Sequence, residues 1–302
     1  MKRRNSIFLT TALALLLCCL AHRPFPQPRY ATRSPIPPPS AQPSATVPMT
    51  KDFAVPVLMY HRICDLTPQE ARSRLTFDLT VTPANFEAQV RYLKAQGFTF
   101  LTARDVEGAI RERAALPVKS VVLTMDDGYQ DNFAQAFPIL QKYGARATMF
   151  LVTDTVETAG HLSWGEVQAM RPQVGYGSHT VHHYDLTQLA PSQLDYELVQ
   201  SKRVLEGRLG EAVPDIAYPS GAYNDQVVAR TRAAGYLAGW KKGGGPATPT
   251  DEPLLLPRVR VRGCTTVARF RQMVWSGVSV QRDHTASRLA RSRTRRARPE
   301  AA

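Results

Sequence analysis

Short apolar runs alternate with amphipathic stretches along most of the chain. The apolar runs are rich in Val, Ile, Leu, Phe and Tyr, which is typical of buried strands. They predict strands at 55–60, 98–101, 121–125, 147–152, 174–178, 215–218, 236–240 and 258–261. Strands that alternate with helices over roughly 220 residues predict a parallel sheet, either a barrel or a doubly wound sheet.

Helical spacing and capping residues mark the segments between these runs. Thr82 and Pro83 form a helix start, Gly97 ends that helix, and Ser163 with Glu166 forms a capping box. The predicted helices lie at about 82–97, 102–113 and 133–143, after Ser163, and at 191–209, 224–234 and 266–274.

The positive charge of the chain lies in its tails. The formal net charge is +13, yet residues 51–280 hold 25 Lys and Arg against 23 Asp and Glu. The Arg-rich segment 281–302 lacks apolar periodicity and is predicted to be disordered. It could contact an anionic membrane or polysaccharide. Because it lacks interleaved aromatic residues, we predict no specific nucleic-acid binding.

The N-terminus is typical of an export signal. Basic residues at 2–4 precede an apolar run from Ile7 to Leu20, which is short for a membrane-spanning helix. We predict a signal peptide or membrane anchor at 1–21 and a Pro-rich disordered linker at 22–50. The protein is therefore expected to be exported, and to be periplasmic, secreted or anchored to the membrane.

The run 121–125 leads directly into Asp126, Asp127 and Gly128. A strand that ends in two acids delivers carboxylates to the carboxyl edge of a sheet, where α/β enzymes place their chemistry. Adjacent residues point in different directions, so the two acids can have different roles. A polar turn after a strand is the alternative interpretation, and this stretch alone favours it.

A histidine cluster follows the run 174–178. His179 and His183 are four residues apart and would share one face of a helical turn, as in paired-histidine zinc sites. His179 and His182 form an alternative pair. A surface cluster or a set of structural histidines is the competing interpretation.

Taken together, these stretches resemble the polysaccharide deacetylases, a carbohydrate esterase family that shares the nodulation-protein-B homology domain. Residues 124–128, Thr-Met-Asp-Asp-Gly, match its first motif, usually Thr-Phe-Asp-Asp-Gly. Residues 179–183, His-Thr-Val-His-His, match its second motif, His-Ser/Thr-x-x-His. The resemblance covers about 55–275, and it implies a distorted, partly open (β/α)7-type barrel with one catalytic domain, predicted at 51–280.

The resemblance also implies roles for the motif residues. Asp127, His179 and His183 would bind a divalent metal, Zn²⁺ first and Co²⁺ or Ni²⁺ otherwise, and Asp126 would be the general base. A metal held by one carboxylate and two imidazoles lowers the pKa of its water toward about 7, which makes that water the nucleophile.

The third family motif corresponds to residues 218–221, Tyr-Pro-Ser-Gly. The resemblance implies that the backbone N–H of Ser220 stabilises the oxyanion of the reaction. Tyr218 and Trp240 are weaker candidates for walls that contact the acetyl group or sugar ring, because either could simply be core.

Two family features are missing from the matching positions. Ala217 stands where the family has an Arg that pairs with the base, so no Arg–carboxylate pair is evident. The C-terminal Leu-x-His that supplies the general acid is also absent. His61 is the candidate replacement, because it ends the first predicted strand and a barrel gathers strand ends around one rim. A structural histidine is the alternative.

His61 in this position resembles a circularly permuted branch of the family that includes the deacetylases of poly-β-1,6-N-acetylglucosamine. In that branch a Met-Tyr-His strand precedes the Asp-Asp motif, as residues 59–61 do here. Closure of the barrel would set the first strand beside the last. Cys64 and Cys264 each lie three residues beyond those strands, and we predict a disulfide between them.

The sequence therefore predicts a monomeric, metal-dependent hydrolase that removes acetyl groups from an N-acetylated polysaccharide, with poly-N-acetylglucosamine favoured. A deacylase or esterase of a small acylated molecule, or of peptidoglycan or chitin oligomers, is the first alternative. A catalytically inactive glycan-binding protein is the alternative from another class. Such a protein would not need the acids and histidines of both motifs.

Overall fold

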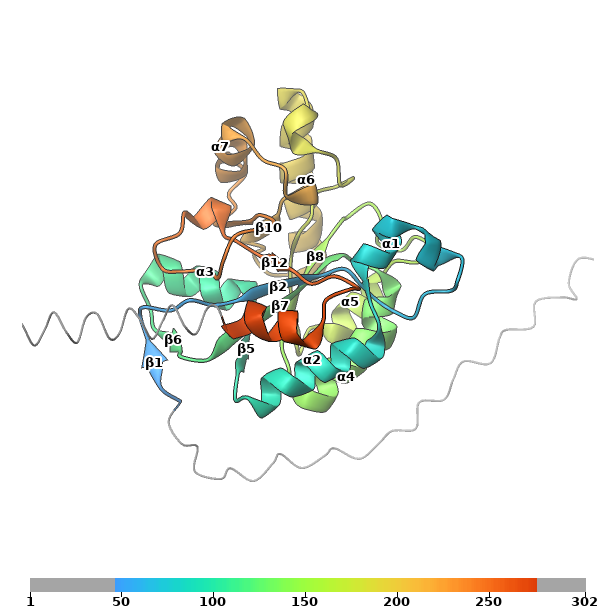
Figure 1. The fold of residues 1–302 in the computed structure, drawn as a ribbon. Helices are drawn as coiled ribbons and strands as arrows, with labels where there is room; N and C mark the ends of the chain where they lie inside the picture. The colour runs from blue at the N-terminus through green and yellow to red at the C-terminus, as the bar shows by residue number, and fades with distance from the viewer. Residues whose placement is uncertain (1–46, 276–302) are drawn as a thin grey trace, which may run out of the picture. The chain divides into compact units, whose positions relative to one another are not determined.

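A computed structural model describes residues 47–275 of the 302-residue chain (Figure 1). The predicted signal segment 1–21, the tail 281–302 and almost all of the linker 22–50 lie outside the described residues. The predicted division of the chain therefore stays a prediction. Within the described part, no helix has the length and apolar character needed to span a membrane.

A parallel sheet forms the centre of the molecule, as the alternation of strands and helices predicted. Its strand order is β11–β10–β9–β8–β7–β2–β12, and β5 pairs with the first half of β7. The strands are β2 (Val57–Tyr60), β5 (Thr99–Leu101), β7 (Ser120–Asp127), β8 (Ala147–Leu151), β9 (Val174–Ser178), β10 (Asp215–Ala217), β11 (Ala238–Trp240) and β12 (Val259–Arg260).

The seven strands of this path form a parallel half-barrel, so the predicted distorted (β/α) barrel is confirmed. The segment just before β12 connects the two edges of the path. Leu256 bridges to Trp240 of β11, and Val259 then pairs with Leu58 of β2. Residues near the C-terminus of the described chain thus lie beside both β11 and β2.

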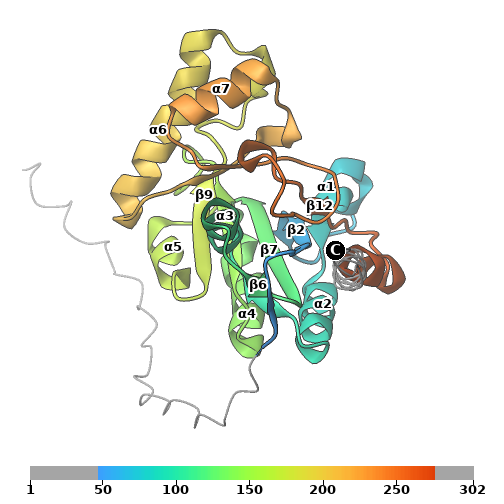
Figure 2. The ribbon, with the colours of Figure 1, turned by 90° about the vertical axis from the view of Figure 1, so that its left-hand side faces the viewer.

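Helices cover the sheet, and capping residues mark their starts (Figures 1 and 2). Thr82 caps α2, Thr102 and Asp105 form a capping box on α3, Ser163 and Glu166 form one on α5, and Asn224 caps α7. The helices are α1 (Arg74–Leu79), α2 (Pro83–Ala95), α3 (Ala103–Glu112), α4 (Phe137–Tyr143), α5 (Trp164–Met170), α6 (Pro191–Leu209) and α7 (Asp225–Ala233), and residues 267–275 are also helical.

Some local elements differ from the sequence-based expectation. The predicted helix 133–143 begins as a π-helical turn, Asn132–Ala136, before α4. Two small pairings outside the main sheet, and α1, were not predicted. The pairings are antiparallel between β1 (Met49–Thr50) and β6 (Leu116–Pro117), and parallel between β3 (Arg62–Ile63) and β4 (Thr80–Val81). Their strands are two residues long, which is too short to produce a periodic pattern.

The predicted disulfide between Cys64 and Cys264 is wrong, because both cysteines are free thiols. After His61 the chain leaves the line of β2 and enters β3, which pairs with β4 instead of the last strand. Cys64 therefore does not continue along the barrel seam. Burial, followed by the charge of Asp131, raises the pKa of the Cys64 thiol to about 11.

Alternation along β7 decides which residues face the inside of the barrel. Leu123 and Met125 join the cluster that packs under α2 and α4, whereas Val122 belongs to the cluster around α3. Successive side chains of a strand point to opposite faces. Thr124 and Asp126 share the parity of Val122, so the strand carries Asp126 on its inner face.

Candidate active site

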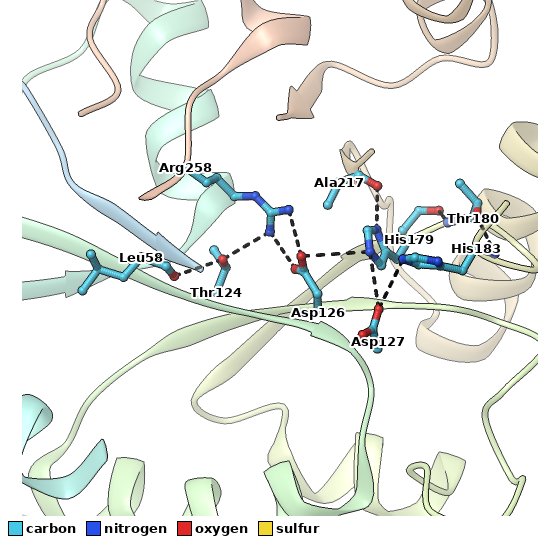
Figure 3. A network of polar contacts seen from close by, with 10 residues as sticks. Leu58, Thr124, Asp126, Asp127, His179, Thr180, His183, Ala217 and Arg258 are labelled. Atoms are coloured by element: carbon cyan, nitrogen blue, oxygen red, sulfur yellow. Dashed lines mark hydrogen bonds and ion pairs between the residues drawn. The ribbon is translucent and has the colours of Figure 1, made fainter. Parts of the chain in front are cut away.

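Asp126 forms a buried, bidentate ion pair with Arg258 (Figure 3). The two guanidinium nitrogens Nη1 and Nη2 donate to Oδ1 at 2.6 Å and to Oδ2 at 2.9 Å. Nη1 also reaches Thr124 Oγ1 at 3.3 Å, and this hydroxyl donates to the carbonyl of Leu58 at 3.1 Å. Arg258, which directly precedes β12, thus holds the carboxylate in one orientation.

Arg258 corrects the expectation that Asp126 has no arginine partner. Ala217 does occupy the position where an arginine was expected, but the guanidinium comes from the residue just before β12. Closure of the barrel brings it across from the far end of the chain. Arg258 directly follows the apolar run 254–257, and this was the available signal, because a buried arginine needs an acidic partner.

The charge on Asp126 follows from this pair. Burial alone would raise the pKa of the carboxyl, but the positive charge of Arg258 outweighs it, and the pKa falls to about 2. Asp126 is therefore ionised at any physiological pH.

Asp127 has a different orientation because the backbone changes direction at the end of β7. Its φ is +73°, in the left-handed region that non-glycine residues seldom adopt. Its Oδ1 atom is buried, and no hydrogen bond from the described residues reaches it. It lies 3.5 Å from His179 Nε2 and 3.6 Å from His183 Nε2 (Figure 3).

Asp127, His179 and His183 form a group that could hold a metal ion, since their ligand atoms lie within 4.8 Å of one another. A buried carboxylate oxygen without a hydrogen-bond donor, facing two imidazole nitrogens, fits the donor set that Zn²⁺ and similar ions prefer. Three protein ligands would leave a position open for water or substrate, which is the arrangement of catalytic sites.

A backbone carbonyl orients the His179 ring for this role. Its Nδ1 lies 2.7 Å from the carbonyl oxygen of Ala217, which can only accept, so Nδ1 carries the proton and Nε2 presents a lone pair. Burial lowers the pKa of His179 and favours the neutral imidazole that a metal requires. The same Ala217 that lacks the expected arginine side chain thus orients a ligand through its backbone.

His182 points elsewhere. Its Nδ1 lies 2.5 Å from Glu197 Oε1, and the N–H groups of Val181 and His182 donate to Oε2 of the same carboxylate. The group that could bind a metal contains His183 and not His182. This agrees with the pair that the family motif implied and that residue spacing left open.

A cavity of about 420 Å³ opens over these residues. Three of the other candidates line it, namely His61, Tyr218 and Ser220. Trp240 is not among the described residues that line the cavity. Its ring is fully buried, and its Nε1 donates to Asp215 at 2.8 Å, so the structure places Trp240 in the core.

His61 lies in the cavity near Asp126. Its Nδ1 is buried, and no described residue forms a hydrogen bond with it. Burial lowers the pKa of His61 to about 4, although the charge of Asp126 acts in the opposite direction. The imidazole is therefore neutral at pH 7 in the free protein, and it must gain a proton before it can act as an acid.

Backbone strain is concentrated around the cavity. Four of the six described non-glycine residues with positive φ belong to the two motifs and the turn after β10, namely Asp127, Thr180, His183 and Ser220. Such conformations are unfavourable and persist where the surrounding structure enforces them, often at functional sites. This strain could not be predicted from the sequence, because none of these residues is glycine.

The fold and the site define a hydrolase built on a distorted (β/α) barrel with a potential metal centre at one rim. Residues 113–239 match the family model described as polysaccharide deacetylase. The candidate polysaccharide deacetylase YxkH of Bacillus subtilis is 30% identical over 219 residues, which cover 72% of this chain and 75% of the relative. The chain belongs to the polysaccharide deacetylase family, hydrolases that act on carbon–nitrogen bonds other than peptide bonds.

Two solved structures and another relative extend this comparison. The deacetylase PplD of Streptococcus pyogenes, in complex with acetate, is 31% identical with a TM-score of 0.69, over 74% of this chain and 99% of that one. The poly-β-1,6-N-acetyl-D-glucosamine N-deacetylase of Staphylococcus epidermidis is 26% identical over 68% of this chain and 78% of its own. IcaB of Ammonifex degensii shares the fold, with a TM-score of 0.63 over 75% of this chain and 97% of its own, at 24% identity.

Proposed function

We propose that the protein removes acetyl groups from an N-acetylated polysaccharide, with poly-N-acetylglucosamine the favoured class. The observation that carries the proposal is that two adjacent aspartates have different surroundings. Asp126 is held ionised by Arg258, and Asp127 presents an unpartnered oxygen to two histidines. The similarity to a poly-β-1,6-N-acetyl-D-glucosamine deacetylase supports this class of polymer.

In this proposal Asp127, His179 and His183 hold the divalent ion, Zn²⁺ first and Co²⁺ or Ni²⁺ otherwise. When bound, the ion supplies a Lewis acid that polarises the acetamide carbonyl and makes water more acidic. His179 keeps the lone pair of Nε2 toward this position because the carbonyl oxygen of Ala217 accepts a hydrogen bond from Nδ1–H. The left-handed backbone of Asp127 and His183 directs their side chains to the same point.

Asp126 acts as the general base and takes a proton from the attacking water. Its pKa of about 2 makes it a weak base, so its contribution rests on position and on negative charge inside a buried site. The backbone N–H of Ser220, at the cavity wall, is proposed to donate to the oxyanion of the tetrahedral intermediate.

His61 is proposed to deliver a proton to the leaving nitrogen, because an amine is a poor leaving group until it is protonated. The imidazole is neutral in the free protein, so the proton that it delivers is the one that Asp126 takes from the attacking water and passes on to His61. The negative charge of Asp126 raises the pKa of His61 and so favours this transfer.

A polymer substrate fits an exported protein, which the N-terminal segment 1–21 predicts. The test is to incubate the purified protein with poly-N-acetylglucosamine, peptidoglycan and chitin oligomers and to measure released acetate. We expect release from poly-N-acetylglucosamine at the highest rate. Acetate release from small acetyl esters but from no glycan would favour a small-molecule esterase, and binding of glycan without any release would favour an inactive binding protein.

A further inference from the structure

A second, smaller cavity of about 280 Å³ adjoins the candidate active site. His182 lines both cavities, so its side chain lies between them and belongs to the wall of each. The second cavity is lined by residues of the loop after the histidine motif and of α6, including Tyr184, Leu189, Gln193 and Tyr196.

Three rings form a stack in this cavity. The imidazole of His182 lies nearly parallel to the ring of Tyr184, with centroids 5.1 Å apart and planes 20° apart. It lies nearly parallel to the ring of Tyr196 as well, at 6.2 Å and 18°. Each tyrosine nevertheless leaves 53% of its surface exposed, which is unusual for such large apolar rings.

Hydrogen bonds to Glu197 hold His182, the ring that both tyrosines contact. Glu197 is buried, with 2% of its surface exposed, and it accepts from both the ring and the backbone of His182. This carboxylate thereby sets the orientation of the imidazole against which the two tyrosines lie. A ring platform that is rigid before binding loses little conformational entropy when a ligand covers it.

The chemistry of the platform fits a sugar ring. A pyranose has an apolar C–H face that packs on aromatic rings and a rim of hydroxyl groups that needs polar partners. Gln193 and Ser192 line the same cavity and can supply those partners. Asp154 lies near the platform, with Oδ2 4.0 Å from His182 Nε2.

We propose that Tyr184, His182 and Tyr196 form a subsite for a second sugar ring of the polysaccharide whose acetyl group occupies the active-site cavity. The inference rests on the proposed function, because it assigns the platform to the same glycan. The shared lining residue His182 places the platform directly beside the active-site cavity, and this position supports a glycan that extends from the active site over an unrelated ligand. Affinity should therefore rise when an oligosaccharide becomes long enough to reach the platform.

The test uses the full chain with Asp126→Asn, in which turnover is blocked, and measures the dissociation constants of N-acetylglucosamine oligomers of increasing length by calorimetry. Tyr184→Ala and Tyr196→Ala are compared with Tyr184→Phe and Tyr196→Phe, which keep the ring. Leu237→Ala, at an apolar residue with 46% exposure outside both cavities, is the matched control. Tyr184, Tyr196 and Leu237 are exposed, so their substitution is expected to leave the fold intact.

We expect each alanine variant to bind long oligomers roughly twofold to tenfold more weakly than the parent does, and to bind short oligomers as the parent does. The phenylalanine variants and the control should retain the gain. Unchanged affinity for long oligomers in both alanine variants, or no gain with length in the parent, would overturn the subsite while acetate release still supported the deacetylase. A parent that binds no oligomer, together with a wild-type protein that releases no acetate from glycans, would contradict both proposals.

Discussion

At the level of single residues, the Arg258 guanidinium determines the state of Asp126. Both groups are almost fully buried, with 1% and 2% of their surfaces exposed. Removal of one partner of such a pair leaves an uncompensated charge in the interior, which usually costs about 3–5 kcal/mol. Arg258 thus serves both the stability of the fold and the charge of the proposed base.

We therefore predict that Arg258→Ala lowers the free energy of unfolding at pH 7 by about 3–5 kcal/mol, measured by urea denaturation. Arg258→Lys keeps a positive charge but cannot form both hydrogen bonds to Asp126, and its free energy of unfolding should fall by less. A variant Arg258→Ala as stable as the wild type would contradict the buried pair.

The same pair predicts a pH dependence. The folded protein lowers the pKa of Asp126 from 3.8 to about 2, so the ionised form stabilises the fold. This contribution, on the order of 2–3 kcal/mol, is present above about pH 4 and is lost as the pH falls toward 2. The difference in stability between the wild type and Arg258→Ala should shrink over this interval, and a difference that stays constant would contradict the assignment.

His61 carries the proposed proton transfer to the leaving group. We predict that His61→Gln reduces acetate release from an acetamide substrate by roughly 10²–10⁴-fold. Hydrolysis of a nitrophenyl acetate should fall much less, because a nitrophenolate leaves without a proton. Steady-state rates on both substrates decide the point, and an equal loss on the two would assign His61 to another role.

The three histidines of residues 179–183 allow a direct test of the ligand set. We predict that His179→Ala and His183→Ala lose the bound divalent metal, measured by mass spectrometry of the purified protein. His182→Ala is the matched control, since its imidazole is engaged by Glu197, and it should retain the metal. Loss of metal in the control alone would reverse the assignment of His182 and His183.

The residues of the two motifs could be predicted because they stand together in the sequence at the ends of two strands. Arg258 could not, because its role depends on closure of the barrel between positions 132 residues apart. The predicted disulfide between Cys64 and Cys264 failed because of a local change in chain direction. It assumed that the chain continues straight beyond its first strand, whereas β3 leaves that line to pair with β4.

At the level of elements, strand β9 shows how closely the sheet is packed beneath the site. A Cβ added at Gly177 would lie 2.5 Å from the ring of Phe150 and 3.0 Å from the carbonyl oxygen of Asp215. At Gly175, two residues earlier in the same strand, the nearest atom would be 3.6 Å away. Gly177 is therefore required by close packing, and Gly175 is not.

We predict that Gly177→Ala lowers the free energy of unfolding by about 1–3 kcal/mol through overpacking, while Gly175→Ala changes it far less. Thermal or urea denaturation of both variants makes the comparison. Equal stability of the two variants would contradict the prediction, because it would mean that the ring of Phe150 moves aside without loss of stability.

The long elements were predictable from the sequence, and the short ones were not. Helix α6 spans the predicted residues, Pro191–Leu209, and the capping boxes of α3 and α5 begin their helices. Strand β12 has only two residues, yet it lies beside β2 and follows Arg258 directly. An element this short is defined by its neighbours and not by its own periodicity.

At the level of the whole molecule, the barrel gathers residues from distant parts of the chain at one rim. His61 follows β2, the two acids end β7, and His179 follows β9. Arg258 precedes β12, and its long side chain reaches Asp126 from there. Family membership establishes a polysaccharide deacetylase, and the geometry supports metal-dependent chemistry with Asp126 as the base.

The most direct test measures acetate released from poly-N-acetylglucosamine together with the metal content of the same samples. The wild type should release acetate, lose this activity on chelation and regain it with Zn²⁺, Co²⁺ or Ni²⁺. Asp126→Asn should bind as much metal as the wild type and release acetate at least 10²-fold more slowly, on the order expected for loss of a general base. Wild-type release by metal-loaded Asp126→Asn, or release that chelation leaves unchanged, would contradict the account.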